Sequence, residues 1–254
     1  MSPDLLSRLY WTWRRLFETH AAPHGGTCAE FGGAHGDGWF ALVDALCQTL
    51  CDRADSQGRV PPLVMQVTEQ HGGLCVELRD SDDAFSIGAI RMAERVSHLI
   101  CELSGKPGRL FKRGTRFRTL APDVGPGEGY ERVGQHGIWI ADGLVPYPPL
   151  PRSEVSQFLV DHWGPFLCCE PDIPGGWLHV ADSMLEEISI GKRCDCLGET
   201  YFEQLQDSPT GLVARAVTGA LEHRGIIALA RALAKRTDRE TGCLDQEASN
   251  ARLL

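Results

Sequence analysis

Apolar residues in the first part of the chain recur with the period of an α-helix. Between Asp4 and Thr19 they fall three or four positions apart and share one face, with arginines on the opposite face. The same spacing predicts a second helix from Trp39 to about Arg53. The segment between them, Pro23 to Gly38, is rich in glycine and histidine and is predicted to be a loop.

Two β-prone runs follow, Leu63 to Glu69 and Leu74 to Leu78. They flank His71-Gly72-Gly73, so we predict a β-hairpin with its turn at these residues. Ser81-Asp82-Asp83 can cap a further helix, predicted from about Ala84 to Leu103. The first half is therefore predicted to be α+β, with helices packed on a small antiparallel sheet.

The composition changes between Asp123 and Arg152, where proline and glycine interrupt the chain and only Gly137 to Ala141 resembles a strand. This change is typical of a connector between domains. The remainder is predicted to be mainly helical, with helices from Ser153 to Trp163, Trp177 to Ile188 and Thr210 to Arg236. The polar tail after Arg236 is predicted to be disordered.

These patterns divide the chain into an α+β module over 1–122, a Pro/Gly-rich connector over 123–152 and a mainly helical module over 153–254. One spacing recurs in both modules: Gly38-Trp39 is followed by Asp44, and Gly176-Trp177 by Asp182. The recurrence has two interpretations, an internal duplication or a coincidence, and both stay open because the hairpin has no clear counterpart in the second half.

Composition limits the compartment and the class of protein. The chain of 254 residues is 43% hydrophobic and 23% charged, which is typical of a soluble globular protein. No apolar run approaches the roughly 18 residues that span a bilayer, and arginines interrupt the N-terminal leucines, unlike a signal peptide. We therefore expect a cytoplasmic protein with no membrane partner, in which the ten cysteines are reduced thiols.

The basic residues are concentrated in one segment although the formal net charge is −9. The segment contains Lys106, Arg109, Lys112, Arg113, Arg116 and Arg118, with Phe111 and Phe117 between them. On a strand–loop–strand ribbon the even-numbered members are expected to share a face. Such a face suits a phosphate backbone or an acidic protein surface, and a charged hairpin that keeps an edge strand soluble is the other interpretation.

The acidic net charge argues against general binding of nucleic acid, because that binding depends on lysine and arginine neutralising phosphates. We therefore favour a protein partner over nucleic acid for the basic segment. The sequence leaves open whether the chain also forms a homo-oligomer.

Cysteine and histidine supply two weaker candidate sites. A soft-ligand metal site could use Cys168, Cys169, Cys194 and Cys196, although adjacent cysteines usually point apart and C-x-C places its thiols awkwardly for one ion. Cys28 could act as a nucleophile with His20, His24 or His35 as its base, but no thiol-hydrolase signature surrounds it. A solvated histidine-rich loop is the simpler interpretation of that segment.

We expect no cofactor. The chain contains no phosphate-cradling glycine loop and no Ser–His–Asp signature. The glycines Gly125, Gly127 and Gly129 lack the preceding strand and following helix of a dinucleotide-binding fingerprint.

Several segments resemble a group of small, functionally uncharacterised bacterial and phage proteins. Gln66 to Leu74 is similar to their recurrent Q-V-K-E-K-F-G-G-L segment, and Gly38-Trp39 to the G-W before their first helix. Ala89 to Ser97 resembles their central helix. Ile100 to Gly108, with Phe117 to Pro122, resembles a terminal zinc ribbon that in many members carries C-E-x-C-G-x-P-G and a later cysteine. The resemblance covers roughly residues 28 to 130 and implies no established activity.

The departures from that pattern concern the metal. Ser104 and Ala121 stand where zinc-binding members have cysteines, so only Cys101 remains and zinc cannot be carried over. We therefore expect a degenerate ribbon that folds without metal. Phe117 in place of a tryptophan, together with the added basic residues, suggests that the ribbon now serves as a contact surface.

The leading hypothesis is a non-enzymatic, cytoplasmic protein-binding protein, most concretely an inhibitor or immunity-type protein that occludes a toxin or an enzyme. Such a role needs complementary charge and a few aromatic or arginine anchors, for which Trp139, Trp163 and Trp177 are candidates. The alternatives are a nucleic-acid-associated regulatory protein that uses the basic ribbon 106–118, and a metal- or thiol-dependent enzyme that uses the C-terminal cysteines.

Overall fold

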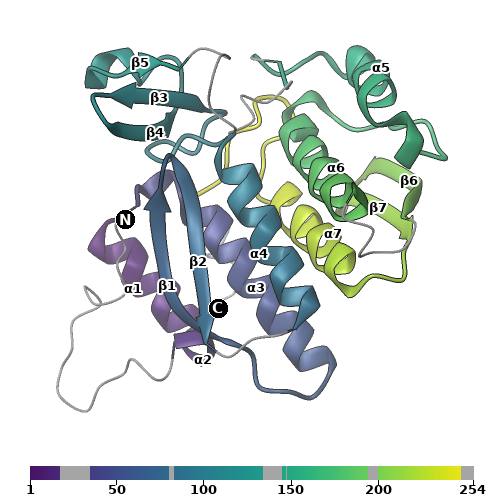
Figure 1. Ribbon diagram of the computed structural model, residues 1–254, viewed down its shortest axis with the longest axis horizontal. Helices are drawn as coiled ribbons and strands as arrows, with labels where there is room; N and C mark the ends of the chain where they lie inside the picture. The colour runs from purple at the N-terminus through teal and green to yellow at the C-terminus, as the bar shows by residue number, and fades with distance from the viewer. Residues whose placement is uncertain (18–34, 80–82, 134–144, 147, 194–199, 247–254) are drawn as a thin grey trace.

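The computed structural model describes residues 1–17, 35–79, 83–133, 145–146, 148–193 and 200–246. Helices form the middle of the molecule, and a β-hairpin flanks them on each of two opposite sides (Figure 1). A third, three-stranded sheet stands apart at one end (Figure 1). The fold is α+β, as the sequence predicts.

The first half begins with two short helices and continues as helix, hairpin and helix. Its elements are α1 (Pro3–Thr12), α2 (Arg14–Phe17), η3 (Asp37–Trp39), α3 (Phe40–Ser56), β1 (Leu63–Gln70), β2 (Gly73–Arg79) and α4 (Ala84–Ser97). The hairpin and the Asp83 cap, whose carboxylate accepts from the Ser86 amide at 3.0 Å, are confirmed. The first predicted helix is instead divided at Trp13, which leaves helical geometry.

The second half has the same order of elements. They are α5 (Arg152–Trp163), η5 (Gly164–Phe166), η6 (Gly175–Trp177), α6 (Leu178–Arg193), β6 (Tyr201–Ser208), β7 (Gly211–Val217) and α7 (Leu221–Ala234). The predicted helix from Thr210 to Arg236 is therefore wrong, because its first part is strand β7 and only its second part is helical. The hairpin therefore does have a counterpart in the second half, and the shared order of elements favours the duplication interpretation.

The two hairpins agree in register as well as in position. Each pairs an eight-residue strand with a seven-residue strand, antiparallel. Each contains a β-bulge near the start of its first strand, between Val64 and Gln66 in one and between Phe202 and Gln204 in the other. A bulge at the same place in both hairpins is a specific shared feature, so it supports duplication more strongly than helix order does.

A glycine–tryptophan pair starts the first long helix of each repeat. The indole of Trp39 donates to the carbonyl of Ile100 at 2.9 Å, and the indole of Trp177 donates to that of Thr237 at 3.0 Å. Both tryptophans are fully buried. Each therefore ties the start of its repeat to the segment that follows the last helix, which closes the repeat on itself.

A tight glycine turn follows the last helix of each repeat. In the first, the amide of Gly105 donates to Cys101 at 2.9 Å, and in the second that of Gly242 donates to Asp238 at 3.0 Å. Gly105 has φ 72° and Gly242 φ 71°, in the left-handed region that favours glycine. Helix α4 thus ends at Ser97 rather than near Leu103. The tail after Arg236, predicted to be disordered, forms this turn as far as Gln246.

The repeats meet where α4 crosses α7, and the contact is reciprocal. A β-carbon added at Gly88 would fall less than 3.0 Å from the carbonyl oxygen of Glu222. A β-carbon added at Gly225 would likewise fall less than 3.0 Å from the carbonyl oxygen of Phe85. The two glycine turns also touch, because the Leu244 amide donates to the carbonyl of Gly105 at 2.9 Å. Each repeat therefore presents the same elements to the other, as across an approximate two-fold axis. One cluster of buried side chains runs through both repeats.

Gly225→Ala is expected to lower the free energy of unfolding by roughly 3 kcal/mol, because the new methyl group would overlap a backbone carbonyl and push the helices apart. For a chain of this length, that loss lowers the thermal midpoint by roughly 6–12 °C. Gly164→Ala is the matched control, since Gly164 ends α5 in helical geometry and a β-carbon there meets open space. Equal thermal midpoints for the two variants would contradict the close crossing.

Candidate protein-binding surface

The basic segment forms a sheet that follows the first glycine turn. It consists of β3 (Arg109–Arg113), β4 (Arg116–Leu120) and β5 (Glu131–Arg132), in the order β4-β3-β5, with η4 (Pro126–Glu128) before β5. The described part of the second repeat, which ends at Gln246, carries no such sheet. The sheet is therefore an addition to the repeated unit, and we call β3 and β4 the ribbon.

The ribbon reverses direction in a two-residue turn of Gly114 and Thr115. Gly114 has φ 61°, and a positive φ at the first central position is what a type II′ hairpin turn requires. This turn matches the twist of the flanking strands, so Arg113 and Arg116 are paired directly beside the tip. Two like charges placed opposite each other are unfavourable for folding.

A small apolar core of its own supports the ribbon. It contains Cys101, Phe111, Leu120, Ala121 and Tyr130, all buried. Gly125 lies against the Phe111 ring, where a β-carbon would fall less than 3.0 Å from it. This core includes residues on both sides of the boundary predicted after Pro122, so the structural unit extends to β5 rather than ending there.

We call the end of the ribbon where Arg109 pairs with Leu120 its root, and the end at the Gly114–Thr115 turn its tip. Hydrogen bonds join the root to the first repeat. The Thr119 hydroxyl donates to the carbonyl of Gly72 in the first hairpin at 2.5 Å. The amide of Glu102 donates to Thr119 at 2.9 Å, and that of Gly108 donates to Leu99 at 2.8 Å. The root is therefore fixed, which leaves the tip as the part available to a partner.

Three of the residues predicted to bind a partner are engaged at this root. Arg109 is buried and donates to the carbonyls of Gly108 and Val145. Phe111 is in the ribbon core. Arg118 forms a largely buried ion pair with Glu102, whose side chain is 2% exposed. Arg109 and Phe111 are inaccessible to a partner, and Arg118 has a structural role.

The expectation that the even-numbered basic residues share a face is wrong. Lys112 pairs with Phe117 across the ribbon, whereas Arg116 pairs with Arg113, and Arg118 with Phe111. Directly paired residues lie on the same face, so Lys112 lies on the face opposite to Arg116 and Arg118. The prediction failed because the two-residue turn reverses the alternation between β3 and β4.

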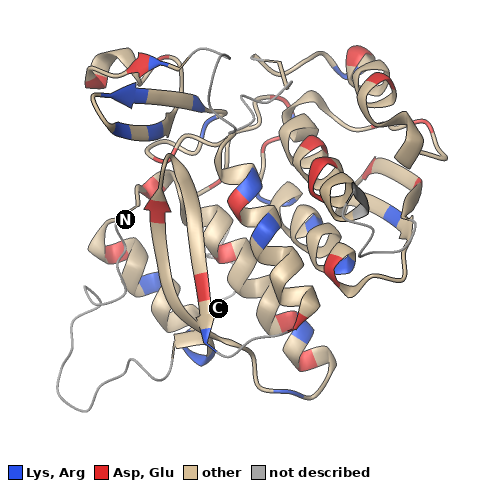
Figure 2. Ribbon diagram, in the orientation of Figure 1, with Lys and Arg blue, Asp and Glu red and all other residues tan. Residues whose placement is uncertain are grey.

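The positive charge that remains available is gathered at the tip. Lys112, Arg113 and Arg116 are exposed there, and Arg132 is exposed on the adjoining strand β5. Arg113 lies over the Tyr130 ring at 4.6 Å and donates to the Glu128 carbonyl, which holds its guanidinium in place. In Figure 2, β3 and β4 carry blue segments and no red, whereas blue and red are mixed over the helices.

The charge of this segment contrasts with that of the rest of the chain. Between Lys106 and Arg118 there are six basic residues and no acidic one, a formal charge of +6. Because the whole chain carries −9, the remaining residues together carry −15. Away from the root, Lys106 pairs with the carboxylate of Asp123 at 2.7 Å. The ribbon tip is thus a local positive surface on an acidic protein.

The turn before the ribbon is held by backbone hydrogen bonds. Cys101 is fully buried in the ribbon core, and its amide donates to the carbonyl of Lys106 at 2.7 Å. The equivalent bond in the second repeat joins Asp238 to Cys243 at 2.8 Å, and there the Asp238 carboxylate accepts from the Thr241 amide. The same turn therefore forms in the second repeat, which has Asp238 and Thr241 in place of Cys101 and Ser104 and so no cysteine at either position.

The predicted metal and thiol sites are only partly within the described residues. Cys168 is exposed and Cys169 is half-buried, and burial raises the pKa of the Cys169 thiol. Cys194 and Cys196 lie outside the described residues. Within the described ranges, no three His, Cys, Asp or Glu side chains are grouped so that they could hold a metal ion. A raised thiol pKa leaves less thiolate, the form that binds metal and attacks electrophiles.

The predicted Cys28 site cannot be placed either, because Cys28, His20 and His24 lie outside the described residues. His35 is buried, and burial lowers its pKa to about 4. A histidine with that pKa is neutral at pH 7.

Two of the three tryptophans proposed as anchors can be placed, and neither is fully exposed. Trp177 is in the core, and Trp163 is half-buried with its indole donating to Asp182 at 2.8 Å. Trp139 lies outside the described residues. Among the described residues, the tryptophan exposed to solvent is Trp11 on α1, with 70% of its surface accessible, and it was not predicted as an anchor. The signal was present, because Trp11 falls off the apolar face of the first predicted helix.

Comparisons with protein-family models, curated proteins and solved structures gave no match for this chain. Across the described ranges, no helix combines the length and the apolar character needed to cross a bilayer.

Proposed function

We propose that this chain is a non-enzymatic protein-binding protein of the inhibitor or immunity type, which covers an acidic site on a toxin or an enzyme with the tip of its ribbon. The observation that carries this proposal is the placement of Lys112, Arg113 and Arg116 on an added sheet with its own core and a fixed root. We also propose that the first repeat is related to the small bacterial and phage proteins that it resembles.

Electrostatics favours this use of the tip. A positive patch attracts an acidic partner during the encounter, and the surrounding net negative charge disfavours nucleic acid and wrong orientations of the partner. The repulsion between the paired Arg113 and Arg116 side chains is unfavourable in the free hairpin. A partner's carboxylates would relieve that repulsion, so binding would gain an interaction that the free protein lacks.

The test combines Lys112→Glu with Arg116→Glu. Both side chains are exposed and outside the ribbon core, so the variant should fold normally. The full chain and the variant are immobilised, and proteins captured from the native host are quantified. We expect the captured amount of one protein to be at least tenfold lower with the variant than with the unmodified chain, because two attractive charges become repulsive. The captured protein's toxic or enzymatic activity should fall when the unmodified chain is added.

The matched control is Arg14→Glu with Arg215→Glu, which changes the net charge equally at exposed sites on α2 and β7. It should capture the same protein as the unmodified chain. Equal capture by the ribbon variant and the control, or a captured protein whose activity is unaffected, would refute the proposal.

The salt dependence of binding distinguishes the alternative function, which is binding of nucleic acid through the ribbon. A duplex oligonucleotide held by several phosphate contacts would lose orders of magnitude in affinity between about 50 and 200 mM salt. The captured protein is expected to remain bound at the higher salt concentration.

A further inference from the structure

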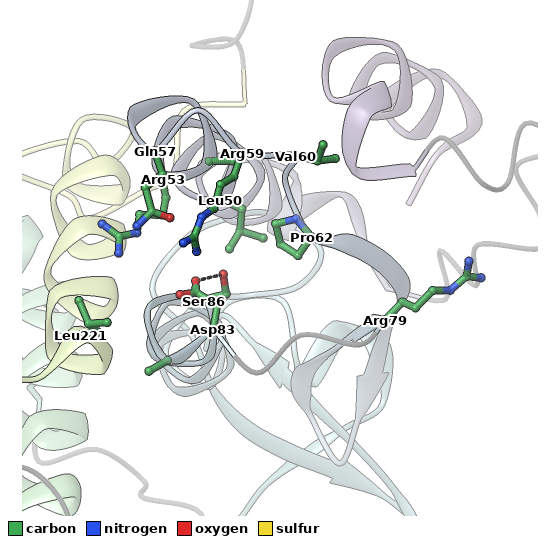
Figure 3. A pocket seen from close by; sticks show the side chains of 12 residues that line it. Leu50, Arg53, Gln57, Arg59, Val60, Pro62, Arg79, Asp83, Ser86 and Leu221 are labelled. Atoms are coloured by element: carbon green, nitrogen blue, oxygen red, sulfur yellow. Dashed lines mark hydrogen bonds between the residues drawn. The ribbon is translucent and has the colours of Figure 1, made fainter.

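A second feature lies at the end of the molecule away from the ribbon. There the C-terminal end of α3, the segment leading into β1 and the N-terminal end of α4 enclose a pocket of about 590 Å³, and Leu221 of α7 completes it (Figure 3). This volume lies within the range of about 300–1,000 Å³ that is typical of ligand-binding sites. We call it the α3–α4 groove.

Three arginines line the groove: Arg53, Arg59 and Arg79. None forms an ion pair with a carboxylate of the described residues, although many other arginines of this acidic chain do. The Arg53 guanidinium lies over the Phe85 ring at 4.8 Å. Asp83, the acidic residue that lines the groove, already accepts from the amide and hydroxyl of Ser86. The groove therefore has a positive character.

Apolar side chains lie between these charges. Leu50 and Pro62 line the groove, together with Val60 and Leu221. Val60 is 85% exposed and Leu221 41% exposed, and both are among the few large apolar residues that the described structure leaves at its surface. Exposed aliphatic surface beside unpaired cations is a combination that a partner carrying both kinds of group would complement.

The arrangement of the arginines determines the kind of ligand. Figure 3 shows Arg59 reaching into the groove toward Asp83 and Ser86, whereas Arg53 and Arg79 lie on opposite sides of the view. Cations that do not converge cannot clamp one phosphate, which needs several donors around a single group. They fit an extended ligand whose negative charges are spaced along its length.

We propose that the α3–α4 groove binds an acidic peptide segment of a partner protein, with an aliphatic side chain placed between carboxylates. The aliphatic side chain packs on Leu50, Pro62 and Leu221, and the flanking carboxylates face Arg59 and Arg79. This site is separate from the ribbon, and it does not depend on the function proposed for the ribbon.

The probe is a random dodecapeptide phage library selected on the full chain. We expect the enriched peptides to carry a net negative charge and an aliphatic residue flanked by Asp or Glu. The best peptide, synthesised with a fluorophore, should bind Arg59→Glu/Arg79→Glu at least tenfold more weakly than the unmodified chain. Both arginines are exposed, so this variant should keep the fold, which circular dichroism and the thermal midpoint check.

Two further variants locate the binding. The variant Val60→Ser/Leu221→Ser should also bind the peptide more weakly, because it removes the apolar contact. Arg14→Glu/Arg215→Glu, with the same change in charge elsewhere, should leave the affinity unchanged, and so should the ribbon variant Lys112→Glu/Arg116→Glu. Failure of the groove is thereby distinguished from failure of the ribbon.

The outcomes that overturn this proposal are specific. They are the absence of any enriched peptide, enrichment of peptides without negative charge, and equal binding to the unmodified chain and the groove variant. Displacement of the peptide by inorganic phosphate at an equal concentration would show a small-anion site instead. Loss of binding in the ribbon variant alone would assign the peptide to the ribbon.

Discussion

Acidification is expected to unfold this chain, with the free energy of unfolding falling by roughly 6 kcal/mol between pH 6.5 and 4.5. Burial lowers the pKa of His35, His98 and His179 to about 4, and a nearby arginine adds to the effect for His98 and His179. A loss of roughly 6 kcal/mol is comparable with the whole free energy of unfolding of a typical domain, about 5–15 kcal/mol.

The sign follows from the direction of these shifts. A histidine with a lowered pKa in the folded state binds its proton more readily when unfolded, so its contribution is complete above pH 6.5 and is lost as the pH falls toward 4. Burial acts oppositely on Glu94 and Asp182, whose pKa values are raised. The contribution of these two carboxyl groups to stability falls as the pH rises through their unfolded-state pKa values, so on acidification they offset part of the histidine effect.

Urea unfolding measured between pH 4.5 and 7.5 checks this prediction. In His179→Gln the number of protons taken up on unfolding should be smaller by about one, because that side chain no longer titrates. The free energy of unfolding should therefore change less steeply with pH. Ser153→Ala is the control: Ser153 is exposed on α5 and does not titrate in this range, so its substitution should leave the pH dependence unchanged. A free energy of unfolding that stays constant from pH 6.5 to 4.5 would contradict the prediction.

Arg236→Met is expected to lower the free energy of unfolding by about 3–5 kcal/mol, because it leaves the carboxylate of Asp44 buried without its cation. Arg236 donates to Asp44 from Nη2 at 2.7 Å and from Nε at 3.0 Å. The side chain of Asp44 is 1% exposed, and its other oxygen accepts from the Trp13 indole at 2.8 Å. For a chain of this length the thermal midpoint should fall by roughly 10 °C.

The double variant Asp44→Asn/Arg236→Met tests the cause. It should recover part of the loss, because the group left behind is then neutral. The repeat supplies a matched comparison, since Asp182 occupies the position of Asp44 and bonds to Trp163 in the same way. Burial raises the pKa of Asp182, so Asp182→Asn should be neutral or stabilising at pH 7. A double variant less stable than Arg236→Met alone would contradict this account.

The first half of the fold could be predicted from sequence because its signals agree. The apolar face of α3, the His71-Gly72 turn and the Asp83 cap each point to the observed element. In the second half, strand β6 was missed. Its bulge places Phe202 and Leu205, three positions apart, in the core, and that spacing reads as helical rather than alternating.

The sequence predicted a strand–loop–strand ribbon at the basic segment, and β3 and β4 form it. The sequence did not show which basic side chains are exposed. Which of them are buried depends on contacts distant in the chain, such as Arg109 with Val145 and Arg118 with Glu102. The α3–α4 groove had no local signal, because Arg59 and Arg79 come near each other only when the first repeat folds, and Leu221 joins them only when the repeats pack together.

The turn formed by residues 237–244 has the geometry of the turn that carries the ribbon in the first repeat. Residues 108–133 grafted after Leu244 would therefore give a protein with two ribbon sheets, one on each repeat. Under the proposed function, such a molecule would hold a dimeric target through avidity, without any change in either individual contact.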